Sequence, residues 1–246
     1  MTSSDELRRV GLARALSKLG YCSRATGFRL VRDRRVRVNG TLREDPEFPV
    51  HLGKDRIEVD QQLVQSIERI YLMMNKPRGV VTTAADERRR ETVYAYLDKR
   101  WPWVAPVGRL DKASEGLLLL TNDSEWAHKV AAPERHLEKT YHVQVATVAG
   151  EGLLDRMLHG VRSPEGDVLR VKRAKVLRGG EKNTWIEVVL DEGKNRQIRR
   201  ILEGLGVEVL RLVRVAVGPL VLGQLMKGEV RRLTMEEQRA VGRHLE

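Results

Sequence analysis

Asp111 stands in the part of the sequence whose residue types and spacing are most suited to catalysis. It ends the tetrapeptide G-R-L-D at residues 108–111, and the apolar run G-L-L-L-L at 116–120 has the composition of a buried strand. Loops held by rigid elements often carry catalytic groups, and a carboxylate there can serve as a nucleophile or as a base. The tripeptide R-L-D alone is more typical of a surface ion pair. The longer string from Gly108 to Asp123 is much more specific.

Two further motifs carry side chains that could act with this carboxylate. E-K-T-Y at 138–141 begins an alternating strand, where Tyr141 could stack on a base or transfer a proton, although a strand tyrosine usually packs. E-G-K-N-R-Q-I-R-R at 192–200 leads from a loop into a helix. Cations at a helix start oppose the macrodipole, so this segment indicates a carboxylate or phosphate partner. A solvated basic helix start is the alternative.

Metal and redox chemistry are not indicated. Cys22 is the only cysteine, so no disulfide can form within the chain, and we expect this residue to be packed. The six histidines are scattered and no nucleotide-binding motif is present, which predicts an activity without metal or cofactor. The polar start, Met1 to Arg9, is unlike a signal peptide, and no segment has the apolar length of a membrane span. We therefore expect a cytoplasmic protein.

The positive charge of the chain is unevenly placed. There are 45 Lys and Arg against 34 Asp and Glu, a net charge of +11. Residues 1–40 hold ten of these cations and three acids, which leaves +7 in that segment. Cations that neutralise phosphates release condensed counterions, so the excess indicates a polyanionic partner. A merely soluble basic protein is the alternative.

The basic N-terminal segment has the pattern of a folded domain. Leucines recur at helical spacing from Leu12 to Leu19, and Ser23 suits the N-cap of a second helix. Valines and arginines then alternate, and Asn39-Gly40 is a strong hairpin signal. Two helices followed by short strands predict a small domain over residues 1–64, with a polar linker after it.

A second domain is predicted over residues 69–246. Strands are predicted at 70–74 and 80–83, where a turn separates them, and at 141–145 and 186–190, where apolar residues alternate; helices are predicted at 92–99 and 198–205. Thr234 with Glu237 suits a capping box for a final helix. Many strands with few interleaved helices favour an α+β fold with a mixed or antiparallel sheet over a doubly wound sheet.

These motifs resemble, in order, the catalytic motifs of bacterial ribosomal RNA pseudouridine synthases. The carriers are G-R-L-D-x-x-S-E-G-L-L-L-L-T-N-D, E-K-T-Y and E-G-K-N-R-Q-I-R-R, and the branch they are most similar to is the RsuA/RluB/RluE/RluF family. M-N-K-P-R-G at 74–79 resembles the opening motif of that family, and Leu12 to Gly40 resembles its S4-type RNA-binding domain. Ser114, Ser124 and Ile201 depart from the residues usual there, but none is an expected catalytic group.

The resemblance implies that uridine in RNA is isomerised to pseudouridine without a cofactor. It makes Asp111 the catalytic carboxylate, acting on the ribose either as a nucleophile at the anomeric carbon or as a base on the 2′ proton. Arg199 would pair with Asp111 and keep it ionised. Tyr141 would stack on the uracil and assist loss of the proton from carbon 5. Arg109 would hold phosphate or keep the target nucleotide flipped out.

Further residues are expected to contact RNA or shape the site. Gln197 is expected to shape its loop and Lys76 to contact a phosphate. Because only 4% of residues are aromatic, phosphate contacts should dominate over stacking in the N-terminal domain. Its expected contacts are Arg14, Lys18, Arg24, Arg34, Arg35 and Arg37. The expected partner is ribosomal RNA, with 23S favoured over 16S, and the chain is expected to be a monomer without membrane contact.

Two other functions stay open at the level of the sequence. One is a non-catalytic ribosome-associated RNA-binding protein, because S4-type domains also occur without this chemistry; the set of Asp111, Tyr141 and Arg199 argues against it. The other is a nucleoside or glycoside hydrolase, which usually needs a second carboxylate as general acid. Glu115 follows too closely in the sequence to be a convincing partner. Pseudouridine in the reacted RNA, without free uracil, would separate the three.

Overall fold

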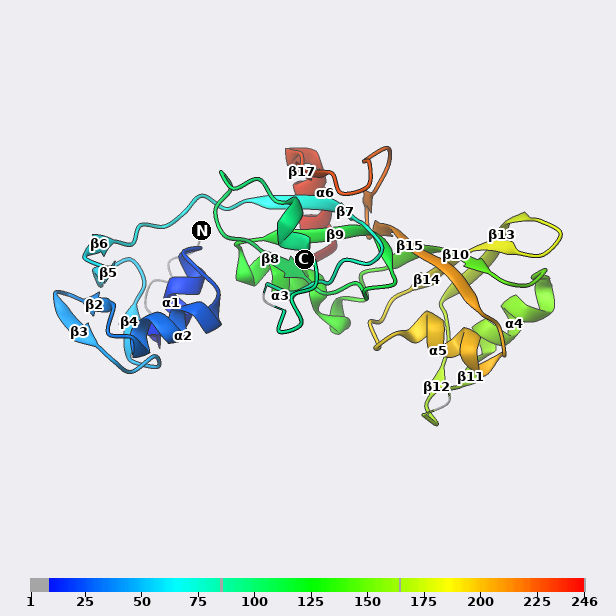
Figure 1. Cartoon of the computed structure of the whole chain (residues 1–246), viewed down its shortest axis with the longest axis horizontal. Coiled ribbons are helices and arrows are strands. Elements are labelled where there is room, and N and C mark those ends of the chain that lie inside the picture. The colour runs from blue at the N-terminus through cyan, green and yellow to red at the C-terminus, as the bar shows by residue number, and fades with distance from the viewer. Residues whose placement is uncertain (1–8, 85, 164, 246) are drawn as a thin grey trace. The chain divides into compact units, whose positions relative to one another are not determined.

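The computed structural model describes residues 9–84, 86–163 and 165–245, and Figure 1 shows the course of the chain. Its internal contacts divide it into two compact units. The first takes in the described residues up to Tyr71, with Asp98–Ala105 and Leu120–Trp126; the second takes in Leu72–Leu97, Pro106–Leu119 and the residues from Ala127 onward. Helices and a mixed sheet together confirm the predicted α+β class.

Two short helices and a small sheet make up the N-terminal part of the first unit. Leu16, Cys22 and Val31 contribute to its single buried core. The sheet order is β3-β2-β5-β6, with a separate ribbon of β1 and β4. The elements are β1 (Arg9–Gly11), α1 (Leu12–Lys18), α2 (Arg24–Arg32), β2 (Val36–Val38), β3 (Thr41–Arg43), β4 (Pro49–His51), β5 (Ile57–Val59) and β6 (Gln62–Leu63).

The local signals of this segment act as predicted. The side chain of Ser23 accepts a hydrogen bond of 3.0 Å from the main-chain N–H of Thr26 and so caps α2. Asn39 and Gly40 have φ values of 51° and 79°, and they turn β2 into β3. Cys22 is buried in the core, and burial raises the pKa of its thiol to about 11. This cysteine is therefore a packed, protonated residue, as expected.

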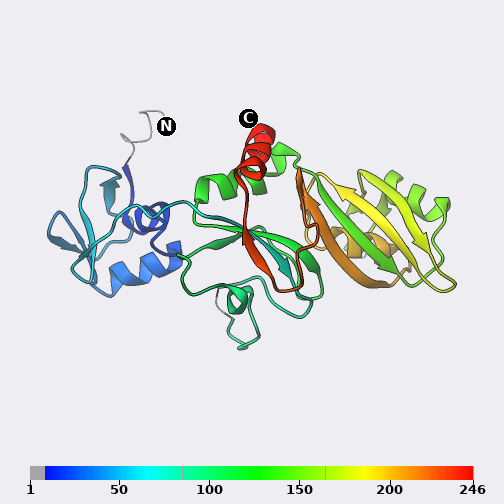
Figure 2. The ribbon, with the colours of Figure 1, turned by 90° about the horizontal axis from the view of Figure 1, so that it is seen from above.

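A nine-stranded mixed sheet is the largest element of the structure (Figure 2). Its order is β13-β14-β10-β15-β9-β7-β17, with β16 paired to β15 and β8 to β9. β10 is antiparallel to β14 and β15, whereas β15 and β9 are parallel. The strands are β7 (Tyr71–Lys76), β8 (Ala105–Val107), β9 (Glu115–Thr121), β10 (Lys139–Val145), β13 (Arg173–Gly179), β14 (Thr184–Leu190), β15 (Val209–Val217), β16 (Leu220–Val221) and β17 (Val230–Arg232).

Helices α4 and α5 pack on one face of β10, β14 and β15. Met157 of α4 and Ile201 of α5 meet Val143, Ile186 and Leu212 of the strands in one core, all of them buried. No helix within the described ranges is long and apolar enough to cross a membrane. The remaining elements are η1 (Val93–Tyr96), α3 (Ser124–Ala131), η2 (Pro133–Arg135), α4 (Glu151–His159), β11 (Val161–Arg162), β12 (Val168–Leu169), α5 (Gln197–Gly204) and α6 (Met235–Leu245).

The capping box predicted before the last helix is present. Thr234 N donates to Glu237 Oε2 at 2.8 Å, and Glu237 N donates to Thr234 Oγ1 at 3.1 Å. Two main-chain N–H groups that the helix itself cannot satisfy are thereby paired. The polar pair at residues 234 and 237 therefore fixes where α6 begins.

Two predicted elements are wrong. Residues 80–83 form no strand: Val81 makes only an isolated bridge to Thr92. The apolar side chains at the start of this segment are buried rather than part of a strand: Val80, Val81 and Thr82 are all buried. The helix predicted over 92–99 is a single 3-10 turn, η1, because the bridge holds Thr92 in an extended conformation with φ −111° and ψ 162°. In both cases tertiary contacts overrode the local pattern.

Gly116 lets β9 approach β15 closely. Its φ of +103° is one that L side chains rarely adopt, and a Cβ atom at this position would lie 2.3 Å from the carbonyl oxygen of Arg214. No atom larger than hydrogen fits there. The glycine of the S-E-G-L-L-L-L string therefore serves the parallel pairing of β9 with β15.

Candidate functional site

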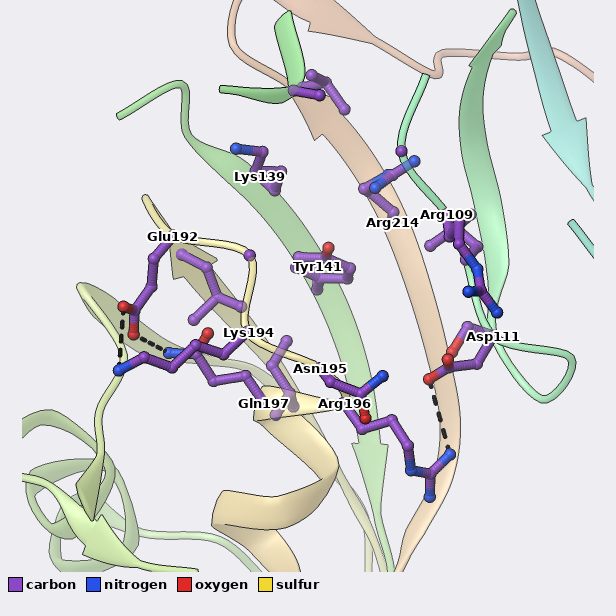
Figure 3. Close-up of a pocket in the computed structure, with 18 of the residues that line it drawn as sticks. Arg109, Asp111, Lys139, Tyr141, Glu192, Lys194, Asn195, Arg196, Gln197 and Arg214 are labelled. Atoms are coloured by element: carbon purple, nitrogen blue, oxygen red, sulfur yellow. Dashed lines mark hydrogen bonds and ion pairs between the residues drawn. The ribbon is translucent and has the colours of Figure 1, made fainter. Parts of the chain in front are cut away.

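A cavity of about 390 Å³ lies where the predicted motifs meet (Figure 3). The loop before β9 contributes Arg109 and Asp111, and β10 contributes Lys139 and Tyr141. β15 contributes Arg214, and residues 192–198 close the opposite side. Three motifs that are distant in the sequence thus line one cavity, and all of its lining residues belong to the second unit.

The loop that carries Asp111 is fixed through its main-chain oxygens. Thr82 Oγ1 donates a hydrogen bond of 2.8 Å to the oxygen of Leu110. The N–H of Gly79 donates one of 2.7 Å to the oxygen of Lys112. The Thr82 hydroxyl is buried, so water cannot easily replace its bond. The main chain on both sides of Asp111 is therefore tied to the segment that follows β7.

Lys76 also holds the loop that carries Asp111, through several hydrogen bonds. Its side chain is fully buried, and Nζ donates to the main-chain oxygens of Pro77 at 3.0 Å, Asp111 at 3.2 Å and Ser114 at 2.8 Å. Burial lowers the pKa of Lys76 to about 8, although the charges of Asp111 and Glu115 act in the opposite direction. All three donors of the ammonium group are used within the protein.

Arg196 is the cation that faces the Asp111 carboxylate. Its Nη1 lies 3.7 Å from Asp111 Oδ2, and Figure 3 shows the two side chains approaching each other from opposite walls. Arg199 lies further along α5 and instead donates from Nη2 to the oxygen of Ala113 at 3.1 Å. Burial and the charge of Arg196 lower the pKa of Arg199, whereas the charge of Asp111 raises it. The expected pairing of Arg199 with Asp111 is therefore corrected: Arg196 makes the direct ion pair.

Tyr141 lines the cavity from β10, beside the buried Arg214 of β15. In the sheet it stands opposite Val188 of β14 on one side and Arg214 of β15 on the other. Arg214 is buried, and its Nε donates a hydrogen bond of 2.7 Å to the oxygen of Leu117. In Figure 3 the tyrosine ring faces the space between the Asp111 loop and the segment before α5. An aromatic face is thus offered to whatever enters.

The segment before α5 is shaped by Gln197. Its amide donates from Nε2 to Glu192 Oε1 at 2.5 Å and to the oxygen of Arg170 at 2.9 Å, and the side chain is buried. Lys194 pairs with the other oxygen of Glu192 at 3.3 Å. Arg196 then takes the left-handed conformation, with φ 48°. These contacts agree with the loop-shaping role expected of Gln197.

Comparison with known proteins identifies the family of this chain. Residues 70–204 match the family described as RNA pseudouridylate synthase, and residues 10–57 match the S4 domain. Ribosomal large subunit pseudouridine synthase B of Bacillus subtilis is 36% identical over 92% of this chain and 93% of its own length. An RNA pseudouridine synthase of Aquifex aeolicus is 33% identical over 93% and 92%. The chain belongs to the RNA pseudouridylate synthase family.

The fold gives the same assignment. A crystal structure of a pseudouridylate synthase superposes with a TM-score of 0.66 and 28% sequence identity, and covers 94% of this chain and 99% of that one. The chain is therefore an RNA pseudouridine synthase with an S4 domain, as the motifs predicted. This membership excludes the non-catalytic RNA-binding protein and the hydrolase that the sequence left open.

Five charged lining residues of the synthase were not singled out from the sequence: Lys139, Glu192, Lys194, Arg196 and Arg214. Lys139 had a signal, because it stands two residues before Tyr141 and so shares its face of the strand. Arg214 had none, since its place depends on the pairing of β15 with β10. Glu192 and Arg196 lie within a recognised motif, but the turn conformation decides where they point.

Several residues of the synthase that were expected to contact RNA are instead buried or paired with acidic side chains. Lys76 is buried beneath the Asp111 loop, so the phosphate contact expected of it is not available in this structure. The N-terminal cations are exposed except for Lys18, which is partly buried. Four of them form ion pairs: Lys18 with Glu125, Arg24 with Glu47, Arg34 with Glu44 and Arg35 with Asp60.

Glu115, the other carboxylate considered from the sequence, has structural partners in the synthase. Glu115 is buried and does not line the cavity; Arg211 and Lys227 each lie 2.9 Å from its oxygens. Burial alone would raise the pKa of Glu115, but the hydrogen bonds from these two cations lower it overall. In the part of the chain that the structure describes, no group of three or more His, Cys, Asp and Glu residues is placed to hold a metal ion.

Proposed function

We propose that this synthase converts uridine to pseudouridine in large-subunit ribosomal RNA, with Asp111 as the catalytic carboxylate. The observation that carries the proposal is that Asp111, Tyr141 and Arg196 line one cavity. The loop that carries Asp111 is held in place through its main chain. A fixed loop holds a reacting carboxylate in place without cost at the moment of reaction. The 23S target is supported by the name of the Bacillus relative, and 16S ribosomal RNA is the second candidate.

The reaction breaks the bond between C1′ of the ribose and N1 of uracil. Asp111 acts either at C1′ as a nucleophile or on the 2′ proton as a base, and in both routes the bonding electron pair leaves with the base. The uracil turns and C5 bonds to C1′, which releases Asp111 from C1′ in the first route and returns the proton to C2′ in the second. The proton on C5 is then lost and N1 gains a proton. The atoms balance as an isomerisation, so we propose that the chemistry uses no metal and no cofactor.

Each remaining residue of the cavity has a proposed task. Arg196 pairs with the Asp111 carboxylate and orients it, and Arg199 acts through the loop by holding the oxygen of Ala113. Tyr141 stacks on the uracil and assists loss of the C5 proton. Arg109 is exposed at the mouth of the cavity, where it holds a phosphate of the flipped nucleotide.

RNA affinity is proposed to come mainly from the N-terminal domain, which we place at residues 1–64, ahead of a catalytic domain at 69–246. The S4 match over residues 10–57 supports this division. Exposed cations such as Arg14 and Arg37 track the RNA backbone without reading its sequence. We further propose that the protein acts as a monomer in the cytoplasm.

Mapping pseudouridines in ribosomal RNA tests the proposal directly. RNA from cells that lack the protein is compared with RNA from the same cells carrying wild-type protein or Asp111→Asn. We expect at least one pseudouridine in 23S RNA that only the wild-type protein restores. A site found only in 16S RNA would move the target to the small subunit. No dependent pseudouridine in either RNA would contradict a ribosomal substrate.

A further inference from the structure

Lys139 is a cation in the cavity to which the proposed mechanism gives no task. It is partly buried and lines the cavity two residues before Tyr141 on β10. Its neighbours across the sheet are Leu190 on β14 and Val217 on β15, both buried and both lining the same cavity. The ammonium group therefore projects from an apolar part of the wall.

Within residues 9–84, 86–163 and 165–245, no acid is paired with this lysine. Among the residues the structure describes, none lies within ion-pair or hydrogen-bond distance of Lys139 Nζ. Two nearby charges act on the pKa of Lys139 in opposite directions. Arg214 lowers it, whereas Asp191, which lies 3.3 Å from Lys172, raises it. Burial contributes most, and the pKa of Lys139 is lowered. A desolvated cation beside another cation is a place to which an anion is attracted.

Arg214 adds a second positive charge to the same wall. It is buried opposite Tyr141, and its single described hydrogen bond uses Nε, which leaves the Nη groups for a partner in the cavity. Asp111, by contrast, is already paired with Arg196. Lys139 and Arg214 thus place two positive charges on the cavity wall beside Tyr141.

We infer that Lys139, with Arg214, stabilises the uracil anion that forms when the bond between C1′ and N1 breaks. This inference rests on the proposed function. The departing electron pair is shared among N1, O2 and O4 of the ring, and cations at the edge of a base stacked on Tyr141 meet that charge as it develops. The interaction is weak with neutral uridine and strong with the anion, which is the condition for lowering the barrier.

The surroundings favour the base over a phosphate as the anion. A phosphate is strongly hydrated and is best met by exposed cations such as Arg109 and Lys194 at the mouth of the cavity. Lys139 lies instead between Leu190 and Val217, where a phosphate would lose much of its hydration. The uracil anion, whose charge is delocalised over a flat ring, loses less hydration free energy than a phosphate on entering this apolar part of the cavity.

The test uses the leaving ability of the base. Fluorine at C5 withdraws electrons and stabilises the uracil anion, so a 5-fluorouridine substrate needs the cation less than uridine does. Loss of each starting nucleoside is followed under single-turnover conditions at saturating full-length enzyme, by chromatography of digested RNA, because C5 of 5-fluorouridine carries fluorine in place of the proton that uridine releases. The variants are Lys139→Met, which keeps the length but not the charge, Lys139→Arg, which keeps the charge, and Lys194→Met as a matched loss of charge at the mouth.

Lys139→Met is expected to slow uridine conversion about 100-fold and 5-fluorouridine conversion less than tenfold, with RNA affinity within threefold of wild type. Lys139→Arg is expected to recover at least a tenth of the wild-type rate. Lys194→Met is expected to weaken RNA binding and to leave the ratio of the two conversion rates as in wild type. Thermal melting and filter binding verify that each variant is folded and binds RNA.

An equal loss on both substrates, or a loss confined to RNA affinity, would overturn the inference and make Lys139 a structural or phosphate contact. Unchanged conversion of uridine by Lys139→Met would overturn it as well. Failure of the proposed function is seen separately, because the wild-type enzyme would then form no pseudouridine from the uridine RNA.

Discussion

Nζ of Lys76 donates a hydrogen bond of 3.2 Å to the main-chain oxygen of Asp111. A fully buried ammonium group thus holds the backbone of the residue that we propose as the catalytic carboxylate. The bond joins the end of β7 to the loop before β9, so two of the recognised motifs meet through it. The side chain of Asp111 remains one-third exposed and open to the cavity. Rigidity of the main chain and access to the side chain are therefore combined at one position.

Replacing Lys76 by methionine should slow catalysis by more than tenfold. The variant keeps the length of the side chain but removes the donors to Asp111 and Ser114, so the loop can shift by the fraction of an ångström that catalysis does not tolerate. Single-turnover pseudouridine formation measures the effect. A variant with the wild-type rate would show that the loop is held adequately by Thr82 and Gly79 alone.

Lys76 should also make the free energy of unfolding depend on pH. Its folded-state pKa of about 8 lies below the unfolded value of 10.5, so the unfolded chain binds more protons between these values and stability rises with pH there. Relative to Lys76→Met, the wild-type free energy of unfolding should increase by on the order of 3 kcal/mol from pH 8 to pH 10.5. Urea denaturation at several pH values gives the difference. A flat difference would contradict a depressed pKa.

Gly116→Ala should destabilise the protein by about 2 kcal/mol or more, because the new Cβ would meet the oxygen of Arg214 at 2.3 Å in a strained conformation. Gly152→Ala is the control. That glycine lies in the first turn of α4 with no atom near its Cβ position, so alanine should be neutral or slightly stabilising. Chemical denaturation compares the two. Equal stability of both variants would show that β9 and β15 can separate without cost.

Arg196 and Arg199 should respond differently to replacement by glutamine. Arg196 is half exposed and faces the Asp111 carboxylate, so its loss should lower turnover and leave the melting temperature nearly unchanged. Arg199 holds the oxygen of Ala113, so its loss should lower the melting temperature as well. Thermal melting and single-turnover kinetics are measured on both. A fall in melting temperature for Arg196→Gln alone would reverse these roles.

Removing N-terminal cations should reduce the salt dependence of RNA binding. Arg14 and Arg37 are exposed, and if each neutralises one phosphate, the double change to glutamine should make the slope of log affinity against log salt shallower by about 1.5 to 2. The control is Arg239→Gln on α6, which lies in the C-terminal helix. Filter binding at several salt concentrations gives the slope. An unchanged slope would mean that RNA does not run along these two residues.

The parts of the fold that sequence predicts well are those encoded locally. Ser23 caps α2 and Asn39-Gly40 makes the hairpin because both act through neighbours only a few residues away. Residues 80–83 were misjudged because their burial comes from packing that no local pattern reveals. The α+β class was predictable because it depends on the sum of many such patterns.

The residues of the candidate site also fall into two groups, those that sequence motifs single out and those that only the structure places. Asp111 could be singled out because it lies in a long, specific motif, and Tyr141 because E-K-T-Y stands in order between two such motifs. The partner of Asp111 could not, because the positive φ at Arg196 redirects that side chain just before α5 begins. Arg214 could not be placed either, since its position opposite Tyr141 exists only once β15 pairs with β10. Side chains that reach a site through strand register need the structure to be recognised.

Single-turnover release of tritium from RNA labelled at C5 of uridine, measured for Asp111→Asn beside wild type, tests the central claim most directly. Asparagine keeps the shape of aspartate but is neither a useful nucleophile nor a base. The account predicts no release from the variant, with RNA affinity within about tenfold of wild type, because binding depends on many cations. Release at a rate near that of wild type would contradict the assignment of Asp111 and the mechanism built on it.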